Sequence, residues 1–170
     1  MKLVDKVGTP APGHAPAAIV RDRPTVLLYA TLGLLGYWLN GLGSVLGQLQ
    51  RQLQVDRGSV AFYPSMFAVA LIAVGLLAGR AAERVGHRVV LAAGLAAMTA
   101  GALLLATPWQ PLTLLGAVLL GVGCALLVQV VPSAVTERHP ADPAVVLGEA
   151  NAVSSWASVL APAAVALAVA

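Results

Sequence analysis

The sequence predicts an all-α membrane protein with five transmembrane helices and a cytoplasmic N-terminus. Three observations lead to this fold class. Only 10% of the 170 residues are charged, whereas 59% are hydrophobic, and the mean hydropathy is +0.86. Uncharged runs long enough to cross a bilayer recur along the chain. Lysine and arginine are concentrated in alternate connecting segments.

The composition also excludes several classes of protein. A soluble domain carries about 25% charged residues, so this chain could not cover a water-facing surface. Its ten basic residues are scattered, which is unlike the basic stripe of a nucleic-acid-binding protein. Cys124 stands alone in an apolar run, where it is expected to act as a small buried hydrophobe. With no metal-ligand cluster, phosphate-binding loop or catalytic constellation in the sequence, we expect no metal, no cofactor and no enzymatic activity.

The five helices are found where charges are absent for about 20 residues, the length needed to cross the hydrocarbon core. The uncharged stretch 89–136 is too long for one span, and Pro108-Trp109-Gln110-Pro111 divides it with a turn. Continuous Ala, Leu, Val and Gly runs are unlike the alternating strands of a β-barrel. The predicted organisation is a cytoplasmic tail at 1–24, followed by a bundle over 25–170 with helices at 25–47, 59–79, 89–107, 112–134 and 149–170.

The orientation follows from counting lysine and arginine in the connecting segments. Only Arg51 and Arg57 would lie outside if the N-terminus is inside. The cytoplasmic side would then carry the other eight, which are Lys2, Lys6, Arg21, Arg23, Arg80, Arg84, Arg88 and Arg138. We expect a multi-pass protein of the cell membrane, specifically of a bacterial inner membrane.

The connection between the second and third helices carries a specific motif, GRAAERVGHR, at residues 79–88. An acidic residue and several basic residues lie between glycines, and two helices joined by so few residues must be antiparallel neighbours. The positions that define the pattern are Gly79, Glu83, Arg84, Gly86 and Arg88. This segment resembles the signature loop between helices 2 and 3 of the major facilitator superfamily. Glu83 stands where the family more often has Asp, and His87 where it has a basic residue.

The resemblance implies a secondary transporter that works by alternating access, with two six-helix bundles around a central site. It also implies a gating role for Glu83, Arg84 and Arg88, whose counterparts latch the two bundles together on the cytoplasmic side. Five helices are one fewer than such a bundle needs, so we expect an N-terminal fragment. Its partners would be the bilayer, a small solute, and either a missing C-terminal half or a second copy. The alternative is a small five-span subunit that does not transport and assembles through Gly/Ala-rich helix faces.

A substrate cavity would need polar side chains at membrane depth, which are costly unless they face a bundle interior. The first helix carries such a stripe at a spacing of three and four residues: Tyr29, Gly33, Tyr37, Asn40, Ser44 and Gln48. The opposite face is largely leucine and is expected to meet lipid. The stripe could line a cavity, or it could join helices with the help of Gly36, Gly43 and Gly47.

Two later helices add further polar candidates. The complete set for a cavity face is Tyr37, Asn40, Ser44, Gln129, Asn151 and Ser155, and helix packing would explain each of them equally. The mostly neutral stripe favours a neutral or amphipathic solute. Glu149 is ionisable and is either an interfacial carboxylate or, if deeper, in need of a partner. No acidic residue lies in the predicted cores of the first four helices, so proton coupling would require a group in the fifth helix or outside this sequence.

Overall fold

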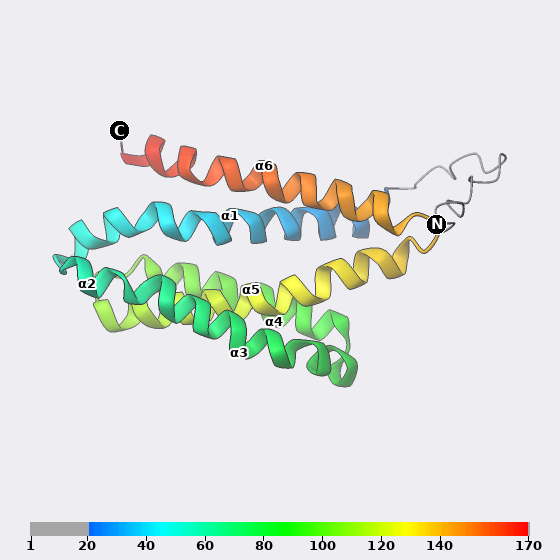
Figure 1. Ribbon diagram of the computed structural model, residues 1–170, viewed down its shortest axis with the longest axis horizontal. Coiled ribbons are helices and arrows are strands. Elements are labelled where there is room, and N and C mark those ends of the chain that lie inside the picture. The colour runs from blue at the N-terminus through cyan, green and yellow to red at the C-terminus, as the bar shows by residue number, and fades with distance from the viewer. Residues whose placement is uncertain (1–20, 170) are drawn as a thin grey trace, which may run out of the picture.

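The computed structural model describes residues 21–169 and shows a bundle of long antiparallel helices (Figure 1). Five of its helices are long and apolar enough to cross a membrane, and the described residues contain no strand. The predicted fold class, an all-α membrane protein with five spans, is therefore confirmed. In chain order the helices are α1 (Arg23–Leu53), α2 (Arg57–Val60, a single turn), α3 (Phe62–Val85), α4 (His87–Leu105), α5 (Gln110–Arg138) and α6 (Pro143–Val169).

Most of the helices are longer than the charge-free stretches from which they were predicted. α1 continues from residue 47 to Leu53, and α5 continues from residue 134 to Arg138. A stretch without charges marks the part of a helix that can lie in the hydrocarbon core of the bilayer. The backbone hydrogen bonds of the helix continue beyond it into the membrane–water interface. At its N-terminus α1 begins within the predicted tail, because Asp22 caps the helix by accepting a hydrogen bond from the Thr25 amide. The rest of that predicted tail, residues 1–20 with Lys2 and Lys6, lies outside the described residues.

The connection between α3 and α4 is shorter than the predicted ten-residue loop. Helix continues through Val85 and starts again at His87, so Gly86 alone makes the turn. Its φ of 88° lies in the region that glycine adopts without a steric penalty. Gly79 plays no part in the turn, contrary to the prediction, because it lies within α3.

α5 is the central helix, with α3 and α4 packed on one side and the α1–α6 pair on the other (Figure 1). Glycines bring α4 and α5 into backbone contact. A β-carbon added to Gly101 of α4 would lie 2.7 Å from the Leu120 amide nitrogen, and one added to Gly123 of α5 would lie 2.7 Å from the Gly94 carbonyl oxygen. Small residues at such crossings allow the close approach on which helix packing in lipid depends.

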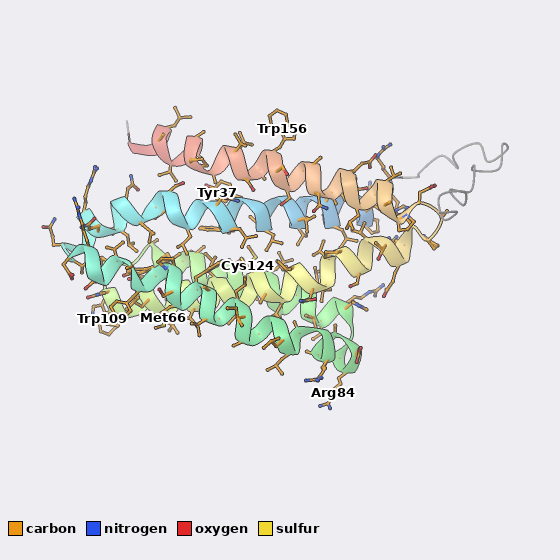
Figure 2. All side chains as sticks on the ribbon, in the orientation of Figure 1. Tyr37, Met66, Arg84, Trp109, Cys124 and Trp156 are labelled. Atoms are coloured by element: carbon orange, nitrogen blue, oxygen red, sulfur yellow. The ribbon has the colours of Figure 1, made fainter. Side chains whose placement is uncertain are left out.

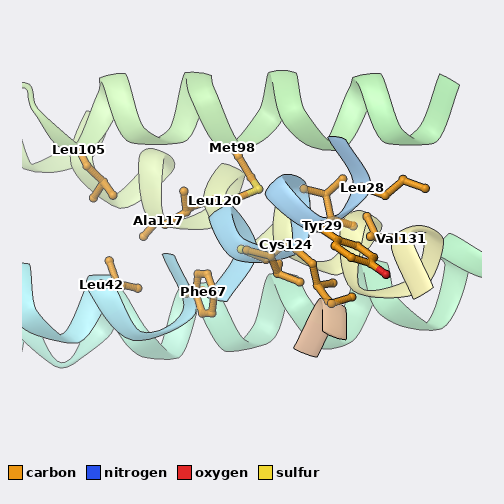
Figure 3. Packing of buried hydrophobic residues seen from close by; sticks show 14 of the residues in the cluster. Leu28, Tyr29, Leu42, Phe67, Met98, Leu105, Ala117, Leu120, Cys124 and Val131 are labelled. Atoms are coloured by element: carbon orange, nitrogen blue, oxygen red, sulfur yellow. The ribbon is translucent and has the colours of Figure 1, made fainter. Parts of the chain in front are cut away.

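The core of the bundle is filled by side chains from α1, α3, α4 and α5, with Val146 and Ala150 from α6 (Figure 3). Cys124 is fully buried there, as predicted. The leucine face of α1 does not meet lipid, contrary to our expectation, but is buried in the bundle. Leu32, Leu35 and Leu42 are at most 5% exposed, because this face of α1 packs against the rest of the bundle.

Candidate functional site

The small and polar stripe of α1 lies against α6. A β-carbon on Gly36 would lie 2.5 Å from the carbonyl oxygen of Ser154. The side-chain amide of Asn40 donates to Ser158 Oγ at 3.0 Å, and that hydroxyl in turn is 3.0 Å from the Gly36 carbonyl oxygen. Around Gly36 the stripe therefore joins two helices through hydrogen bonds and close backbone contact.

The six predicted cavity residues do not form one connected site in the described part of the chain. Tyr37 is half-buried and packs edge-to-face on Trp38, with ring centroids 5.6 Å apart. No hydrogen bond links the side chain of one candidate to that of another within residues 21–169. Four of the candidates are exposed on the surface of the bundle: Asn40, Gln129, Asn151 and Ser155.

Ser158 is a polar contact that the sequence analysis missed. Ser154 and Ser158 are four residues apart and so share one face of α6. That spacing, opposite a glycine-rich helix, could have indicated a polar crossing.

A groove opens between α1 and α6 at the end of the bundle away from the described N-terminus. Its volume is about 300 Å³. Two members of the stripe, Ser44 and Gln48, contribute to it. The other lining residues are Gly47 and Arg51 of α1, with Pro162, Val165 and Ala166 of α6. Ser44 and Gln48 of the stripe are therefore accessible from the groove, whereas the stripe around Gly36 is covered by α6.

The opposite end of the bundle is held by a polar network that joins α1, α5 and α6. Arg21 pairs with Glu149 through two nitrogens, at 3.2 Å and 2.5 Å, and the Tyr29 hydroxyl donates to the same carboxylate at 3.0 Å. A second pair joins Asp22 to Arg138 at 2.6 Å. The hydrogen bonds that Arg21 donates to Glu149 raise the pKa of Arg21, so this guanidinium stays charged.

Asp22 gives this network a testable pH dependence. Hydrogen bonds from Thr25 and Arg138 lower the pKa of Asp22 from 3.8 to about 2. Because folding lowers the pKa of Asp22, its ionised carboxylate stabilises the folded protein. This stabilisation is complete at pH values above 3.8 and is lost as the pH falls toward about 2. The Asp22→Asn variant should therefore melt at a lower temperature than the parent at neutral pH. The difference should shrink between pH 3.8 and about 2. Thermal melts of both proteins in detergent across this range test the expectation, and a gap that stays constant would contradict it.

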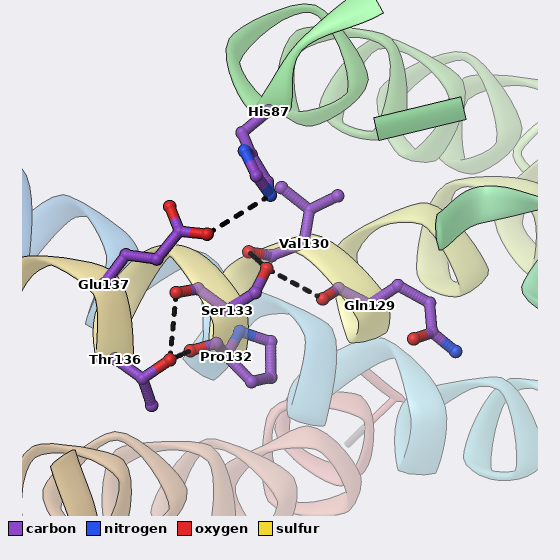
Figure 4. A network of polar contacts seen from close by, with 7 residues as sticks. All are labelled: His87, Gln129, Val130, Pro132, Ser133, Thr136 and Glu137. Carbon is purple, nitrogen blue, oxygen red and sulfur yellow. Dashed lines mark hydrogen bonds and ion pairs between the residues drawn. The ribbon is translucent and has the colours of Figure 1, made fainter. Parts of the chain in front are cut away.

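The segment 79–88 lies at the same end as the polar network, and its charged side chains face outward. Glu83, Arg84 and Arg88 are exposed, and Figure 2 shows Arg84 pointing away from the bundle. His87 is the exception, because its Nε2 lies 3.9 Å from a carboxylate oxygen of Glu137 at the end of α5 (Figure 4). The three outward charges make no hydrogen bond or ion pair with the other described residues.

The hydroxyl groups of α5 beside the His87–Glu137 pair form their hydrogen bonds within α5 itself. The hydroxyls of Ser133 and Thr136 bond to backbone carbonyls around Pro132 (Figure 4). Ser133 also bonds to the carbonyl oxygen of Gln129 at 3.2 Å, which leaves the amide of that side chain out of the network. The exposed side-chain amide of Gln129 makes no hydrogen bond within the described residues.

Comparison with known proteins identifies the family. The profile described as Major Facilitator Superfamily matches residues 26–170, which include all five membrane-spanning helices. The chain belongs to the major facilitator superfamily. The motif at 79–88 lies inside the match, across the end of the second span and the start of the third, as the resemblance implied.

Among curated proteins, this superfamily member is similar to the uncharacterized transporter YycB of Bacillus subtilis (strain 168). The two are 23% identical over 109 residues, which make up 64% of this chain and 27% of the relative. The chain thus aligns with about a quarter of that transporter's length. No solved structure matches.

Proposed function

We propose that this superfamily member acts in secondary active transport of a small solute by alternating access. The observation that carries this proposal is the family match across all five spans. It favours transport over the alternative of a non-transporting subunit. Because the chain aligns with only 27% of its transporter relative, the activity would involve further helices, from a C-terminal half or a second copy.

We propose that the N-terminus is cytoplasmic and that the protein lies in the cell membrane, as in a bacterial inner membrane. The antiparallel order of the helices supports this orientation. It brings the start of α1, the turn at Gly86 and the end of α5 to the same end of the bundle (Figure 1). That end carries six of the described arginines: Arg21, Arg23, Arg80, Arg84, Arg88 and Arg138. Basic residues favour the cytoplasmic side.

For the solute site we propose the exposed polar side of the α1–α6 pair. The Asn40 amide nitrogen is held by Ser158 and by the Gly36 carbonyl oxygen, so the orientation of the exposed side chain is fixed. Its carbonyl oxygen accepts no hydrogen bond from the described residues and would accept one from a solute. Tyr37 and Ser44 follow the same helix face, and Asn151 and Ser155 are exposed on α6. The exposed Gln129 would contribute from the neighbouring helix α5. A neutral solute with hydrogen-bond donors suits this chemistry.

The test is uptake by cells or proteoliposomes containing the complete transporter. Asn40→Ala should raise the KM of the transported solute about tenfold, which corresponds to the loss of one hydrogen bond. Tyr37→Phe should raise it by a smaller factor. Thr99→Val is the matched control, because the exposed Thr99 hydroxyl bonds only to its own helix, at the Leu95 carbonyl oxygen. Unchanged KM in both α1 variants would remove this face as the solute site.

We further propose that Glu83, Arg84 and Arg88 gate the cytoplasmic side, with Gly86 making the turn between their helices and Gly79 lying within α3. Their outward position at the α3–α4 turn supports this role, since a latch must reach another bundle. In the same uptake assay, Glu83→Ala should lower kcat while KM remains close to that of the parent protein. Transport at the parent rate by this variant would exclude the latch.

A further inference from the structure

The groove between α1 and α6 forms because the two helices diverge toward one end. Gly36, Gly43 and Gly47 share one face of α1, at spacings of seven and four residues. A β-carbon on Gly36 would lie 2.5 Å from the Ser154 carbonyl oxygen, whereas one on Gly43 or Gly47 would meet nothing within 4 Å. The helices that touch at Gly36 are therefore apart at Gly47, which lines the groove.

The two walls of this groove differ in chemistry. The α1 wall is polar, because Ser44, Gln48 and Arg51 follow one helix face at spacings of four and three residues. The α6 wall is apolar and consists of Pro162, Val165 and Ala166. A ligand that suits both walls has a polar group on one side and an apolar body on the other. The volume of about 300 Å³ lies at the lower end of the range for ligand pockets, so the ligand is small.

Arg51 determines which polar group the groove would favour. Its side chain is exposed, and its guanidinium makes no ion pair with the described residues. Among those residues Asp56 supplies the carboxylate at this end of the bundle, but it caps α2 by accepting hydrogen bonds from Gly58 and Ser59. The positive charge of Arg51 therefore lacks a counter-charge in the groove. A guanidinium in this situation favours a carboxylate over a neutral group.

We propose that this groove binds a small amphipathic carboxylate, whose anionic group lies on Arg51 and Gln48 and whose apolar body lies against Val165. It is a second ligand site, separate from the solute contact at Asn40. Asn40 and Arg51 are eleven residues apart, or about 16 Å along the helix, so one small molecule cannot contact both. The proposal concerns binding alone and does not depend on the transport function proposed above.

Benzoate is a suitable probe because it joins a carboxylate to an apolar ring, and benzamide is its neutral counterpart. Saturation-transfer NMR of the full chain in phosphatidylcholine nanodiscs measures binding, with the signal of empty nanodiscs subtracted. Benzoate should bind the parent protein. Arg51→Gln should raise its Kd about tenfold, which corresponds to the loss of one charged hydrogen bond. Benzamide should bind the parent and this variant equally.

Two matched controls separate the groove from its surroundings. Arg57 is an exposed arginine at the same end that does not line the groove, so Arg57→Gln should leave the Kd of benzoate unchanged. Ala166→Phe places a ring in the groove and should abolish binding, whereas Ala163→Phe adds the same ring at an exposed position of α6 outside it. The Ala163 variant should bind benzoate like the parent, which distinguishes filling of the groove from damage to α6.

Several results would overturn the proposal. A parent protein that does not bind benzoate has no such site. Equal losses in the Arg51 and Arg57 variants would mean a general attraction between charges, and binding that persists in Ala166→Phe would place the ligand elsewhere.

A phospholipid headgroup is the competing source of an anionic group at this end of the bundle. Native mass spectrometry in mixed phosphatidylcholine and phosphatidylglycerol counts the anionic lipids that stay bound. Equal retention of phosphatidylglycerol by Arg51→Gln and Arg57→Gln is expected if the groove takes a free carboxylate. Loss of a bound phosphatidylglycerol in Arg51→Gln alone would assign the groove to lipid and overturn the proposal.

Discussion

Gly36→Ala should destabilise the α1–α6 pair more than any other single methyl group added to α1. The new β-carbon would lie 2.5 Å from the Ser154 carbonyl oxygen, and this backbone atom cannot turn aside as a side chain can. Overpacking of this kind costs about 1–3 kcal/mol. The change should appear as a lower midpoint in unfolding by a denaturing detergent.

The matched control for this prediction lies on the same helix. A β-carbon at Gly43 meets nothing within 4 Å. Because alanine favours helix over glycine by about 1 kcal/mol, Gly43→Ala should leave the midpoint unchanged or raise it. Equal losses in the two variants would show that α6 does not pack on α1 through Gly36.

A second large effect is expected where α4 crosses α5. Leu127 is fully buried, and its side chain fills the space beside Gly94. Leu127→Ala should lower the free energy of unfolding by about 2–5 kcal/mol, because it leaves a cavity. Gly94→Ala should also destabilise the parent, because its β-carbon would lie 2.9 Å from Leu127 Cδ2.

The two substitutions are expected to compensate each other. In the Leu127→Ala background the obstructing atoms are gone, so Gly94→Ala should cost less than it does alone and partly fill the cavity. A double-mutant cycle measures this coupling. Strict additivity of the two losses would mean that the residues are not in contact.

The positions of the membrane-spanning helices could be predicted because they depend on composition. Which face of each helix packs against its neighbours could not be predicted in this way. Charge gaps located all five helices, and Pro108-Trp109-Gln110-Pro111 marked the turn between α4 and α5. The same hydropathy cannot distinguish a leucine that meets lipid from one that meets another helix, since both surroundings are apolar. The leucine face of α1 was therefore expected to meet lipid, although Leu42 on that face is buried in the bundle.

The candidate site was only partly predictable for a related reason. Spacing placed Asn40 and Gly36 on one side of α1, but it could not say which helix lies opposite. In the structure Ser158 of α6 lies opposite Asn40 and Gly36, so this part of the stripe packs against α6. The partners of Glu149 were equally hidden, because Arg21 and Glu149 are separated by 128 positions in the chain.

The single-residue turn at Gly86 has a consequence for how the protein is made. It obliges α3 and α4 to enter the bilayer as a paired unit, yet both pack mainly on α5 and make few contacts with each other. α5 is synthesised after both of them. While the ribosome is still making α5, Gly94 and Gly101 of α4, which pack on α5 in the finished bundle, have no partner. The central helix of the finished bundle is thus the fourth span to arrive, and assembly of the first three must wait for it.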